Sequence, residues 1–358
     1  MNNIFKFAIT ELSQDAFICW CINFFNYDCN LKKLSIDLLK KFNIKNIDKI
    51  DSIKILKQFQ KIDILLILNG INTAVIIEDK TYTSEHNNQI ENYVNSLKKS
   101  GSNNHLNINE NTKIVVVYFK TGFLFENDKN TVYNIQNNHK YNGALVTGND
   151  FKIILEKYKG INYLLDSYLY NLCENLEKEN HYRLYYKKDN SEQWNISTSQ
   201  IAQYEFINSL FPENWRKYKN HIFKINTRHN NSCYPFTYID IEYIDECYFQ
   251  WRVDTNKTGP FLELKMYNKY DKKSEEQKNL HILKYRKYKD IIKDIIISNN
   301  IFEFDDISPK RNSESCFNPT FIHISLEPIF NSWKTKEDET VFINKIQTIT
   351  TKFINKVK

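Results

Sequence analysis

The sequence predicts a mixed α/β fold, because helical and strand patterns alternate along the whole chain. In the first third the predicted order is helix, strand, strand, strand, helix, strand, and the second half mixes alternating strands with long helices. The chain has 358 residues, of which 41% are hydrophobic and 26% are charged, as in an ordinary globular protein. That length is enough for one large domain or two medium ones.

Composition and motifs exclude several classes of protein. No apolar run reaches the 18 or more residues of a membrane span, and the N-terminus has no signal-peptide pattern. Seven irregularly spaced cysteines fit a reducing compartment, so we expect a cytoplasmic protein that does not bind membranes. The glycine-rich nucleotide motifs, H-E-x-x-H and G-x-S-x-G do not occur. The net charge of +6 is compatible with a polyanionic partner without identifying one.

The N-terminal region is predicted to be helical. Glu11–Phe25 has apolar residues at helical spacing, with Thr10 or alternatively Ser13 as the N-cap, and Leu31–Phe42 forms a second helix. Glu11 and Asp15 are four residues apart, which places both carboxylates on one face of the first helix. Such a pair can supply a metal ligand or form a solvated helix edge.

Three strands are predicted next, and the last two form a hairpin. Ser52–Phe59 is the first strand; Ile62–Leu68 and Thr73–Ile77 are apolar runs separated by the turn sequence Asn69–Asn72. If these four residues form the loop, Leu68 faces Thr73, and the same register places Asp63 opposite Glu78. A two-residue loop would shift this pairing.

The charged residues of the hairpin are expected to converge. Glu78 and Lys80 are two apart and share a face of their strand, whereas the side chain of Asp79 points to the other face. Two neighbouring carboxylates repel each other, and a divalent cation such as Mg²⁺ relieves that repulsion. A lysine beside them can orient or deprotonate a water molecule. The alternative is a surface hairpin with an ion pair at its rim.

A helix over Glu85–Lys99 follows the hairpin. Gln89 and Tyr93 are four residues apart and therefore lie on one face of it. They either face the carboxylate patch or form a polar helix edge with a partly buried tyrosine. The next strand, Lys113–Phe119, is followed by Lys120, a further cation at a strand terminus.

The remaining chain is predicted in less detail. Residues 123–150 read as loop-rich, and the polar segment Glu177–Gln193 is the best candidate for a domain boundary. We expect helices at Asp150–Lys157, Asn162–Leu176, Ser199–Leu210, Glu275–Ile297 and Glu337–Lys356. We expect strands at Tyr234–Asp245, Cys247–Asp254, Phe261–Tyr267 and Phe321–Leu326.

Two segments interleave basic with aromatic residues. Tyr182–Lys188 and Lys284–Lys289 have the composition of surfaces that follow a nucleic-acid backbone and stack on bases. The alternative is a solvated helix face in a chain rich in lysine and tyrosine. Four tryptophans of the second half are expected to be anchors of the core or of satellite cores and not base-stacking platforms: Trp194, Trp215, Trp251 and Trp333.

The chain resembles the PD-(D/E)XK nuclease superfamily over roughly residues 4–122. The resemblance consists of Asp63 followed by Glu78-x-Lys80 on adjacent strands in an α-β-β-β-α order, with the proline that often precedes the aspartate replaced by Ile62. Gln89-Ile-Glu-Asn-Tyr93 resembles the Q-x-x-x-Y motif of the exonuclease-like branch. Glu11 lies where several of these families have an extra acidic residue.

The resemblance implies the fold of the first domain, and the polar segment Glu177–Gln193 predicts where that domain ends. Residues 1–185 would form a nuclease-like domain with a restriction-endonuclease-like α-β-β-β-α-β core. Residues 190–358 would form a C-terminal α+β domain for recognition of substrate or partner, or for homo-oligomer formation. The resemblance says little about this second domain.

The resemblance also implies roles for the site residues. Asp63, Glu78 and the backbone carbonyl of Asp79 would hold Mg²⁺, or Mn²⁺ as a substitute, with Glu11 completing the site. Lys80 would position or activate the attacking water. Gln89 and Tyr93 would support the site.

The expected activity is metal-assisted hydrolysis of phosphodiester bonds, with DNA as the expected substrate. The alternative is a catalytically silent module that binds nucleic acid or regulates a partner while keeping the nuclease core. Defence against foreign DNA is the biological role that the superfamily suggests.

Overall fold

The computed structural model describes residues 3–358 except for 9, 28, 82, 86–87, 100–105, 139, 185–198, 218–224, 230–234, 257–258, 269–274, 308, 310–318 and 334. The chain divides into two compact units, Met1–Asn180 and His181–Lys358. Each unit contains a five-stranded sheet and helices, which confirms the predicted mixed α/β class. No helix in the described ranges is long and apolar enough to cross a membrane.

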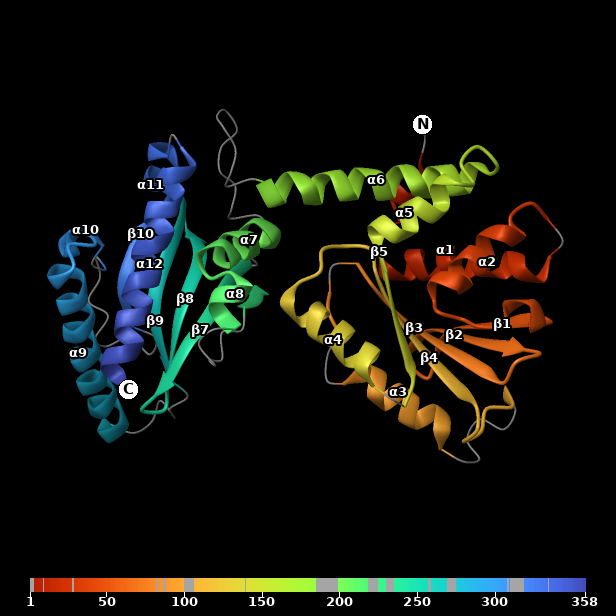
Figure 1. Cartoon of the computed structure of the whole chain (residues 1–358), viewed down its shortest axis with the longest axis horizontal. Helices are drawn as coiled ribbons and strands as arrows, with labels where there is room; N and C mark the ends of the chain where they lie inside the picture. The colour runs from red at the N-terminus through yellow and green to blue at the C-terminus, as the bar shows by residue number, and fades with distance from the viewer. Residues whose placement is uncertain are drawn as a thin grey trace. The chain divides into compact units, whose positions relative to one another are not determined.

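The first unit is built on a mixed sheet with strand order β1-β2-β3-β4-β5 (Figure 1). Its first three strands are antiparallel neighbours, whereas β3, β4 and β5 run parallel to one another. The strands are β1 (Ser52–Phe59), β2 (Ile62–Asn69), β3 (Thr73–Lys80), β4 (Lys113–Lys120) and β5 (Asn142–Thr147). Leu68 pairs with Thr73, so the predicted four-residue turn and hairpin register are confirmed.

Helices cover both faces of this sheet. One face packs against α1 (Glu11–Asn23), α2 (Lys32–Lys41), α5 (Gly148–Glu156) and α6 (Tyr163–Leu184). The other packs against α3 (Gln89–Lys98) and α4 (Glu126–Asn137). Short 3₁₀ helices lie at Ile4–Lys6, Phe24–Asn26 and Ile47–Lys49. Every residue of β3 is buried, as expected for a central strand with helices on both sides.

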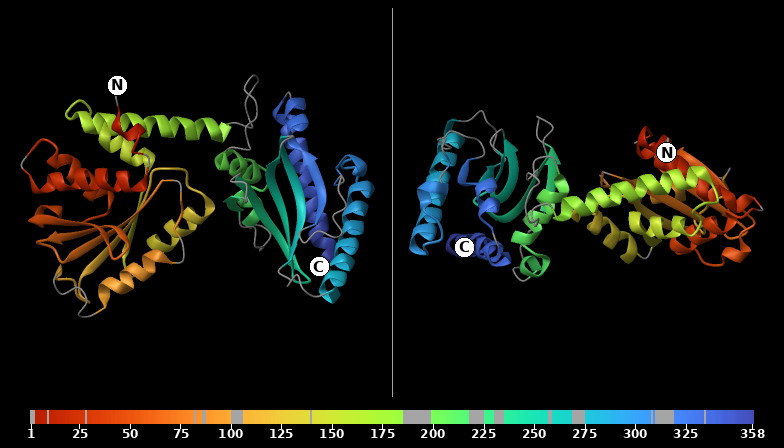
Figure 2. Two further views of the ribbon diagram at one scale, coloured as in Figure 1. Left: turned by 180° about the vertical axis from the view of Figure 1, so that it is seen from behind. Right: turned by 90° about the horizontal axis from the view of Figure 1, so that it is seen from above.

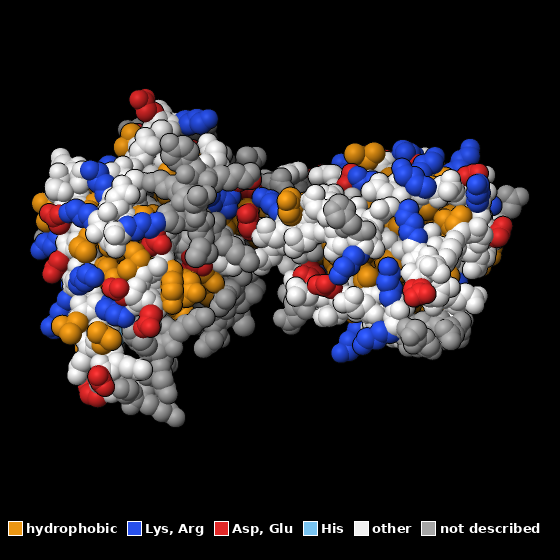
Figure 3. Space-filling view, turned by 60° about the horizontal axis from the view of Figure 1, so that its bottom comes forward, with side chains coloured by type: hydrophobic (Ala, Val, Ile, Leu, Met, Phe, Trp, Pro, Cys, Tyr) orange, Lys and Arg blue, Asp and Glu red, His pale blue; other side chains and the backbone are white. Residues whose placement is uncertain are grey.

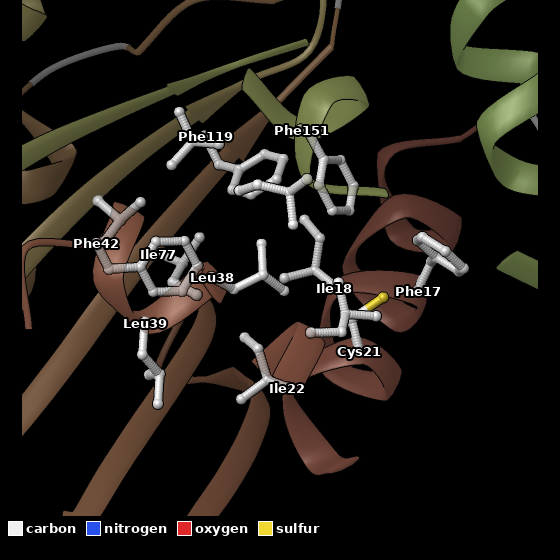
Figure 4. Close-up of a cluster of buried hydrophobic side chains, with 14 of the residues drawn as sticks. Phe17, Ile18, Cys21, Ile22, Leu38, Leu39, Phe42, Ile77, Phe119 and Phe151 are labelled. Atoms are coloured by element: carbon white, nitrogen blue, oxygen red, sulfur yellow. The ribbon is translucent and has the colours of Figure 1, made fainter. Parts of the chain in front are cut away.

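The larger apolar core lies between the sheet and the α1–α2 pair (Figure 4). Ile18 and Ile22 from α1 and Leu38 from α2 are fully buried there, and they face Ile77 of β3 and Phe119 of β4. This packing holds α1 against the end of β3 where the charged residues Glu78-Asp79-Lys80 occur.

The prediction that residues 123–150 are loop-rich is wrong. Helix α4 and strand β5 both lie in this segment. The side chain of Asp128 accepts a hydrogen bond from the backbone N–H of Phe125 at 2.9 Å and so caps α4. Asparagines predominate in α4, so its sequence did not indicate the apolar face that contains buried Ile135. In β5, buried residues alternate with partly buried ones.

Two predicted helix boundaries also need correction. Helix α3 begins at Gln89 and not at Glu85, because Asn88 takes a left-handed conformation with φ of 56° and starts the helix. Helix α6 continues to Leu184, well beyond the predicted end at Leu176. The polar composition of its last turns was interpreted as a linker, but polar residues are also typical of an exposed helix.

The second unit contains an antiparallel sheet with strand order β10-β9-β8-β7-β6. Its strands are β6 (Ile225–His229), β7 (Pro235–Ile244), β8 (Cys247–Asn256), β9 (Gly259–Asn268) and β10 (Thr320–Ser325). Its helices are α7 (Gln200–Leu210), α8 (Glu213–Lys217), α9 (Glu275–Ser298), α10 (Phe304–Ile307), α11 (Leu326–Ser332) and α12 (Lys336–Val357). β6, α8, α10 and α11 were not predicted. α9 and α12 pack side by side (Figure 2).

Trp251 is the central anchor of the second unit. It is fully buried on β8, and its indole Nε1 donates a hydrogen bond to Thr350 Oγ1 of α12 at 2.8 Å. The predicted core role is therefore confirmed for Trp251. Trp215 and Trp333 are half-buried, and Trp194 lies outside the described residues.

Candidate active site

Asp63, Glu78 and Lys80 lie together on one face of the sheet, near the C-terminal end of β3. Lys80 Nζ is 2.7 Å from Glu78 Oε1 and 3.4 Å from Asp63 Oδ2. Glu78 and Lys80 point to the face that packs against α3, because they share it with Ala74 and Ile76 of the same strand, which belong to the α3-side core. The structure thus brings the three predicted residues to one patch.

The β2–β3 ladder ends one pair short of Asp63. Its last pair is Ile64 with Ile77. Beyond this pair, the Asp63 carboxylate takes the place of a backbone carbonyl as the hydrogen-bond acceptor. Asp63 Oδ2 accepts a hydrogen bond from the backbone N–H of Asp79 at 3.0 Å. The N–H and C=O of one residue in an extended strand point toward the same neighbouring strand, so the Asp79 carbonyl is also directed to the Asp63 side.

Glu78 is a buried carboxylate. Its side chain is 1% exposed, and burial raises its pKa to about 7, although the Lys80 ammonium opposes the shift and Asp63 adds to it. Among the described residues, its Oε2 atom is buried without a hydrogen-bond partner. A buried carboxylate oxygen without a partner is unfavourable and is suited to receive a cation.

Lys80 lies between two carboxylates. Burial alone would lower its pKa, but the Glu78 and Asp63 carboxylates outweigh burial, so the net shift is upward. The Lys80 ammonium has three donors, so it can bind both carboxylates and a water molecule.

The side chain of Asp79 points to the opposite face of the sheet, toward α1. Its Oδ1 accepts a hydrogen bond from Gln14 Nε2 at 2.6 Å. Gln14 Oε1 in turn accepts from Thr121 Oγ1 at 2.7 Å and from the Tyr168 hydroxyl at 2.9 Å. Burial and the nearby Asp15 carboxylate raise the pKa of Asp79 well above its usual range. The side chain thus links β3 to α1 and α6, while the backbone faces Asp63.

Glu11 lies at the first turn of α1 and binds the segment that follows β3. Its Oε1 accepts hydrogen bonds from the backbone N–H of Thr81 and from Thr83 Oγ1, both at 2.9 Å. Its charge adds to the upward shift in the pKa of Lys80. The carboxylate is therefore close to the patch and also holds the end of β3.

Gln89 and Tyr93 are in contact on α3. Gln89 Nε2 donates to the Tyr93 hydroxyl at 3.3 Å. Burial raises the pKa of Tyr93 to about 12, and the Glu78 and Asp63 carboxylates contribute to this shift. The structure thus brings Gln89 and Tyr93 together on α3.

Gln58 of β1 is a site residue that the sequence did not indicate. Its Nε2 is 3.2 Å from Asp15 Oδ2 and 3.5 Å from Asp63 Oδ1, so one amide lies between two carboxylates. Its backbone is left-handed, with φ of 53°. This conformation is rare for a residue with a Cβ and explains why a strand pattern gave no sign of it.

Lys120, at the end of β4, is fully buried beside the site. Its Nζ donates to the backbone carbonyl of Thr83 at 2.5 Å and lies 3.6 Å from Asp128 Oδ2. Asp128 also accepts a hydrogen bond from the Tyr118 hydroxyl at 2.5 Å. Burial lowers the pKa of Lys120 despite the Asp128 charge. This cluster, Tyr118–Lys120–Asp128, anchors the segment between β3 and α3.

The donor set of the patch fits a hard cation of the Mg²⁺ type. In the described part of the chain there is no group of three or more His, Cys, Asp or Glu side chains arranged to hold a metal. Mg²⁺, however, is usually held by one or two carboxylates with waters and substrate phosphates. Asp63 and Glu78 provide two carboxylates, and the unpartnered Glu78 Oε2 provides an oxygen that nothing else occupies.

The basic–aromatic segment on α9 is largely committed to folding. Tyr285 and Tyr288 are buried, and Lys284 donates to the Asp245 backbone carbonyl at 2.6 Å while Lys287 pairs with its carboxylate at 3.4 Å. These contacts favour the solvated-helix interpretation. In Figure 3, basic and acidic side chains are interspersed on the face that is shown. Most side chains of Tyr182–Lys188 lie outside the described residues.

Comparisons with protein-family models, with curated proteins and with solved structures found no significant match.

Proposed function

We propose that the chain is a Mg²⁺-dependent nuclease that hydrolyses phosphodiester bonds, with DNA as its substrate. The observation that carries the proposal is the meeting of Asp63, Glu78 and Lys80 at the end of β3, where one buried oxygen of Glu78 has no partner among the described residues. Two carboxylates beside an ammonium group are the groups that metal-assisted phosphodiester hydrolysis uses.

The sheet supports this proposal. A hairpin that leads into two parallel strands, with α1 on one face and α3 on the other, is the arrangement expected of a restriction-endonuclease-like core. Charged residues lie at the end of a central strand that is otherwise apolar and buried. Burying charge at that place is unfavourable for stability, which favours a functional reason for it.

Each residue has a role that its contacts support. Asp63, Glu78 and the Asp79 carbonyl would hold Mg²⁺, which when bound supplies Lewis-acid stabilisation of the charge that develops on the phosphate. The Lys80 ammonium orients the attacking water and offsets negative charge on the phosphate oxygens. Gln89 and Tyr93 would support the site from α3, where Gln89 donates a hydrogen bond to the Tyr93 hydroxyl.

Glu11 and the Tyr118–Lys120–Asp128 cluster act on the segment after β3. Glu11 binds Thr81 and Thr83, and Lys120 binds the Thr83 carbonyl. These contacts hold the end of β3 and so fix the positions of Glu78 and Lys80. We assign Glu11 to this positioning role, with metal binding as an additional role.

A catalytically silent nucleic-acid-binding module is the second candidate. The observation that favours it is that Lys80 forms ion pairs with both Asp63 and Glu78, so the patch has a partial charge balance without a metal. Under this alternative the carboxylates would be a structural ion-pair group.

The two candidates are separated by a cleavage assay on linear and circular DNA, single- and double-stranded, and on RNA. We expect DNA cleavage with Mg²⁺ or Mn²⁺, no cleavage with EDTA, and no cleavage by Lys80→Ala. Tight DNA binding without cleavage under either metal would favour the silent module.

A further inference from the structure

A polar cavity of about 490 Å³ lies in the first unit, at the same edge of the sheet as the candidate site but on the α1 side. Its wall includes residues from the N-terminal segment, the start of α1, the ends of β3 and β4, and one face of α6. Among the residues of the wall are Phe5, Lys6, Thr81, Tyr168, Asn171 and Asn175. The volume lies within the usual range for small-molecule sites and exceeds the space that one nucleobase needs.

Two asparagines of α6 provide the recognition groups. Asn171 and Asn175 are four residues apart, so both lie on one face of the helix, and both are half-buried in the wall of the cavity. Neither side-chain amide has a hydrogen-bond partner among the residues that the structure describes. Each amide offers one acceptor and two donors, the pattern that reads the edge of a nucleobase.

The charges of the wall favour a neutral ligand. Lys6 lies 3.5 Å from Glu174, and the wall contains one further lysine and one further glutamate, Lys178 and Glu179. A phosphate would meet as many negative as positive groups, whereas a neutral group that forms hydrogen bonds would not be repelled.

Apolar groups complete the wall. The rings of Phe5 and Tyr168 are in edge-to-face contact at 5.0 Å, and Leu172 also lines the cavity. Tyr168 is held in place by the hydrogen bond from its hydroxyl to Gln14. Aromatic and aliphatic surface next to two amides suits a flat heterocycle with a polar edge.

Thr81 connects the cavity to the candidate site. It follows Lys80 directly, lines the cavity, and donates its backbone N–H to Glu11. A nucleic acid with a phosphate at Asp63 and Glu78 would have to pass around this strand end to place a neighbouring base in the cavity.

We propose that the α6 cavity binds a single nucleobase of the substrate, through Asn171 and Asn175, next to the phosphate that is cut. This inference rests on the proposed nuclease function and adds to it a subsite that gives base preference. Asn171 and Asn175 are specificity residues and do not take part in the hydrolysis.

The test uses free nucleosides with the full-length protein, without metal and without any phosphate. Adenosine, guanosine, cytidine and thymidine are titrated separately, and the side-chain amide signals of the protein are followed by ¹⁵N–¹H NMR. We expect saturable binding of at least one nucleoside with millimolar or tighter affinity. Binding should weaken at least fivefold in Asn171→Ala and in Asn175→Ala.

Asn180→Ala is the matched control, because Asn180 is exposed on the same helix and does not line the cavity. It should bind nucleosides as the wild-type protein does. The backbone spectra of all three variants show whether each is folded. Failure of every nucleoside to bind to the wild-type protein would overturn the proposal, as would binding that neither Asn171→Ala nor Asn175→Ala weakens.

The outcome does not depend on cleavage. Nucleoside binding that requires the two asparagines, in a protein that cuts no nucleic acid, would retain the subsite and reject the nuclease function. DNA cleavage without nucleoside binding would retain the nuclease function and reject the subsite.

Discussion

At the scale of single residues, Glu78 determines the character of the site. Its carboxylate is buried, yet it lies next to an ammonium group and a second carboxylate. Burial raises its pKa from 4.5 to about 7, so the folded state binds a proton more tightly than the unfolded state. Between these two values, folding takes up a proton, and stability must fall as pH rises.

The Glu78→Gln variant should remove this pH dependence. Relative to Glu78→Gln, the free energy of unfolding of the wild-type protein should decrease by up to about 3 kcal/mol from pH 4.5 to pH 7 and then level off. Urea denaturation at several pH values, without divalent metal, measures the difference. The exposed Glu91→Gln serves as control and should show no such trend. If the difference in unfolding free energy between wild type and Glu78→Gln did not change with pH, the Glu78 carboxylate would not be buried as described.

Gln58 shows how backbone strain serves the site. Its left-handed backbone places one amide between Asp15 and Asp63. Gln58→Ala and Gln58→Gly both lose the amide, but only glycine adopts φ of 53° without steric conflict. Gln58→Gly should therefore be more stable than Gln58→Ala by about 1 kcal/mol in denaturant unfolding. If the alanine variant were the more stable one, the left-handed assignment would be wrong.

At the scale of elements, the hairpin β2–β3 could be predicted from sequence and helix α4 could not. Asn69–Asn72 between two apolar runs set the turn length, and turn length sets the register of every pair up to Ile64 with Ile77. In α4, by contrast, asparagines predominate, and the helix depends on a cap from Asp128 and on tertiary burial of Ile135. Single-sequence patterns do not reveal such tertiary support.

The site shows the same division. Side chains that share one face of a strand or of a helix could be predicted to lie together. Glu78 with Lys80 and Gln89 with Tyr93 are the two cases. Gln58 could not be predicted, because its role depends on a local exception to strand geometry. The cavity could not be predicted either, because it combines α6 with the ends of β3 and β4, which are about ninety and about fifty residues away in sequence.

The Tyr118–Lys120–Asp128 cluster is expected to stabilise the segment after β3. Lys120→Met removes the charge, keeps much of the volume, and leaves Asp128 buried with two neutral donors. We expect Lys120→Met to lower the free energy of unfolding by about 3 kcal/mol. When Asp128→Asn is added, the loss in the double variant should be smaller than the sum of the losses in the two single variants.

Lys129→Met is the control for this cycle, because Lys129 forms an exposed ion pair with Glu126 on the same helix as Asp128. Lys129→Met should lower the free energy of unfolding by less than about 1 kcal/mol. Strictly additive effects of Lys120→Met and Asp128→Asn would show that the buried pair is not an interacting unit.

At the scale of the whole molecule, the chain has two units with separate cores. Trp20 packs against the core of the first, and Trp251 is buried in the second. Trp251→Ala should destabilise the second unit by about 3–5 kcal/mol. Hydrogen exchange should then accelerate in β7–β9 and stay unchanged in β2–β4, and Trp20→Ala should produce the reverse pattern. Acceleration in both sheets by either variant would mean that the units unfold as one.

We propose that the patch at the end of β3 hydrolyses phosphodiester bonds, and an assay of DNA cleavage by Glu78→Ala tests this proposal. Purified wild-type protein and the folded variant are incubated with linear and circular DNA in Mg²⁺ buffer, with Glu91→Ala as the matched control. We expect cleavage by the wild-type protein and by Glu91→Ala, and none by Glu78→Ala. Full activity of Glu78→Ala would contradict it.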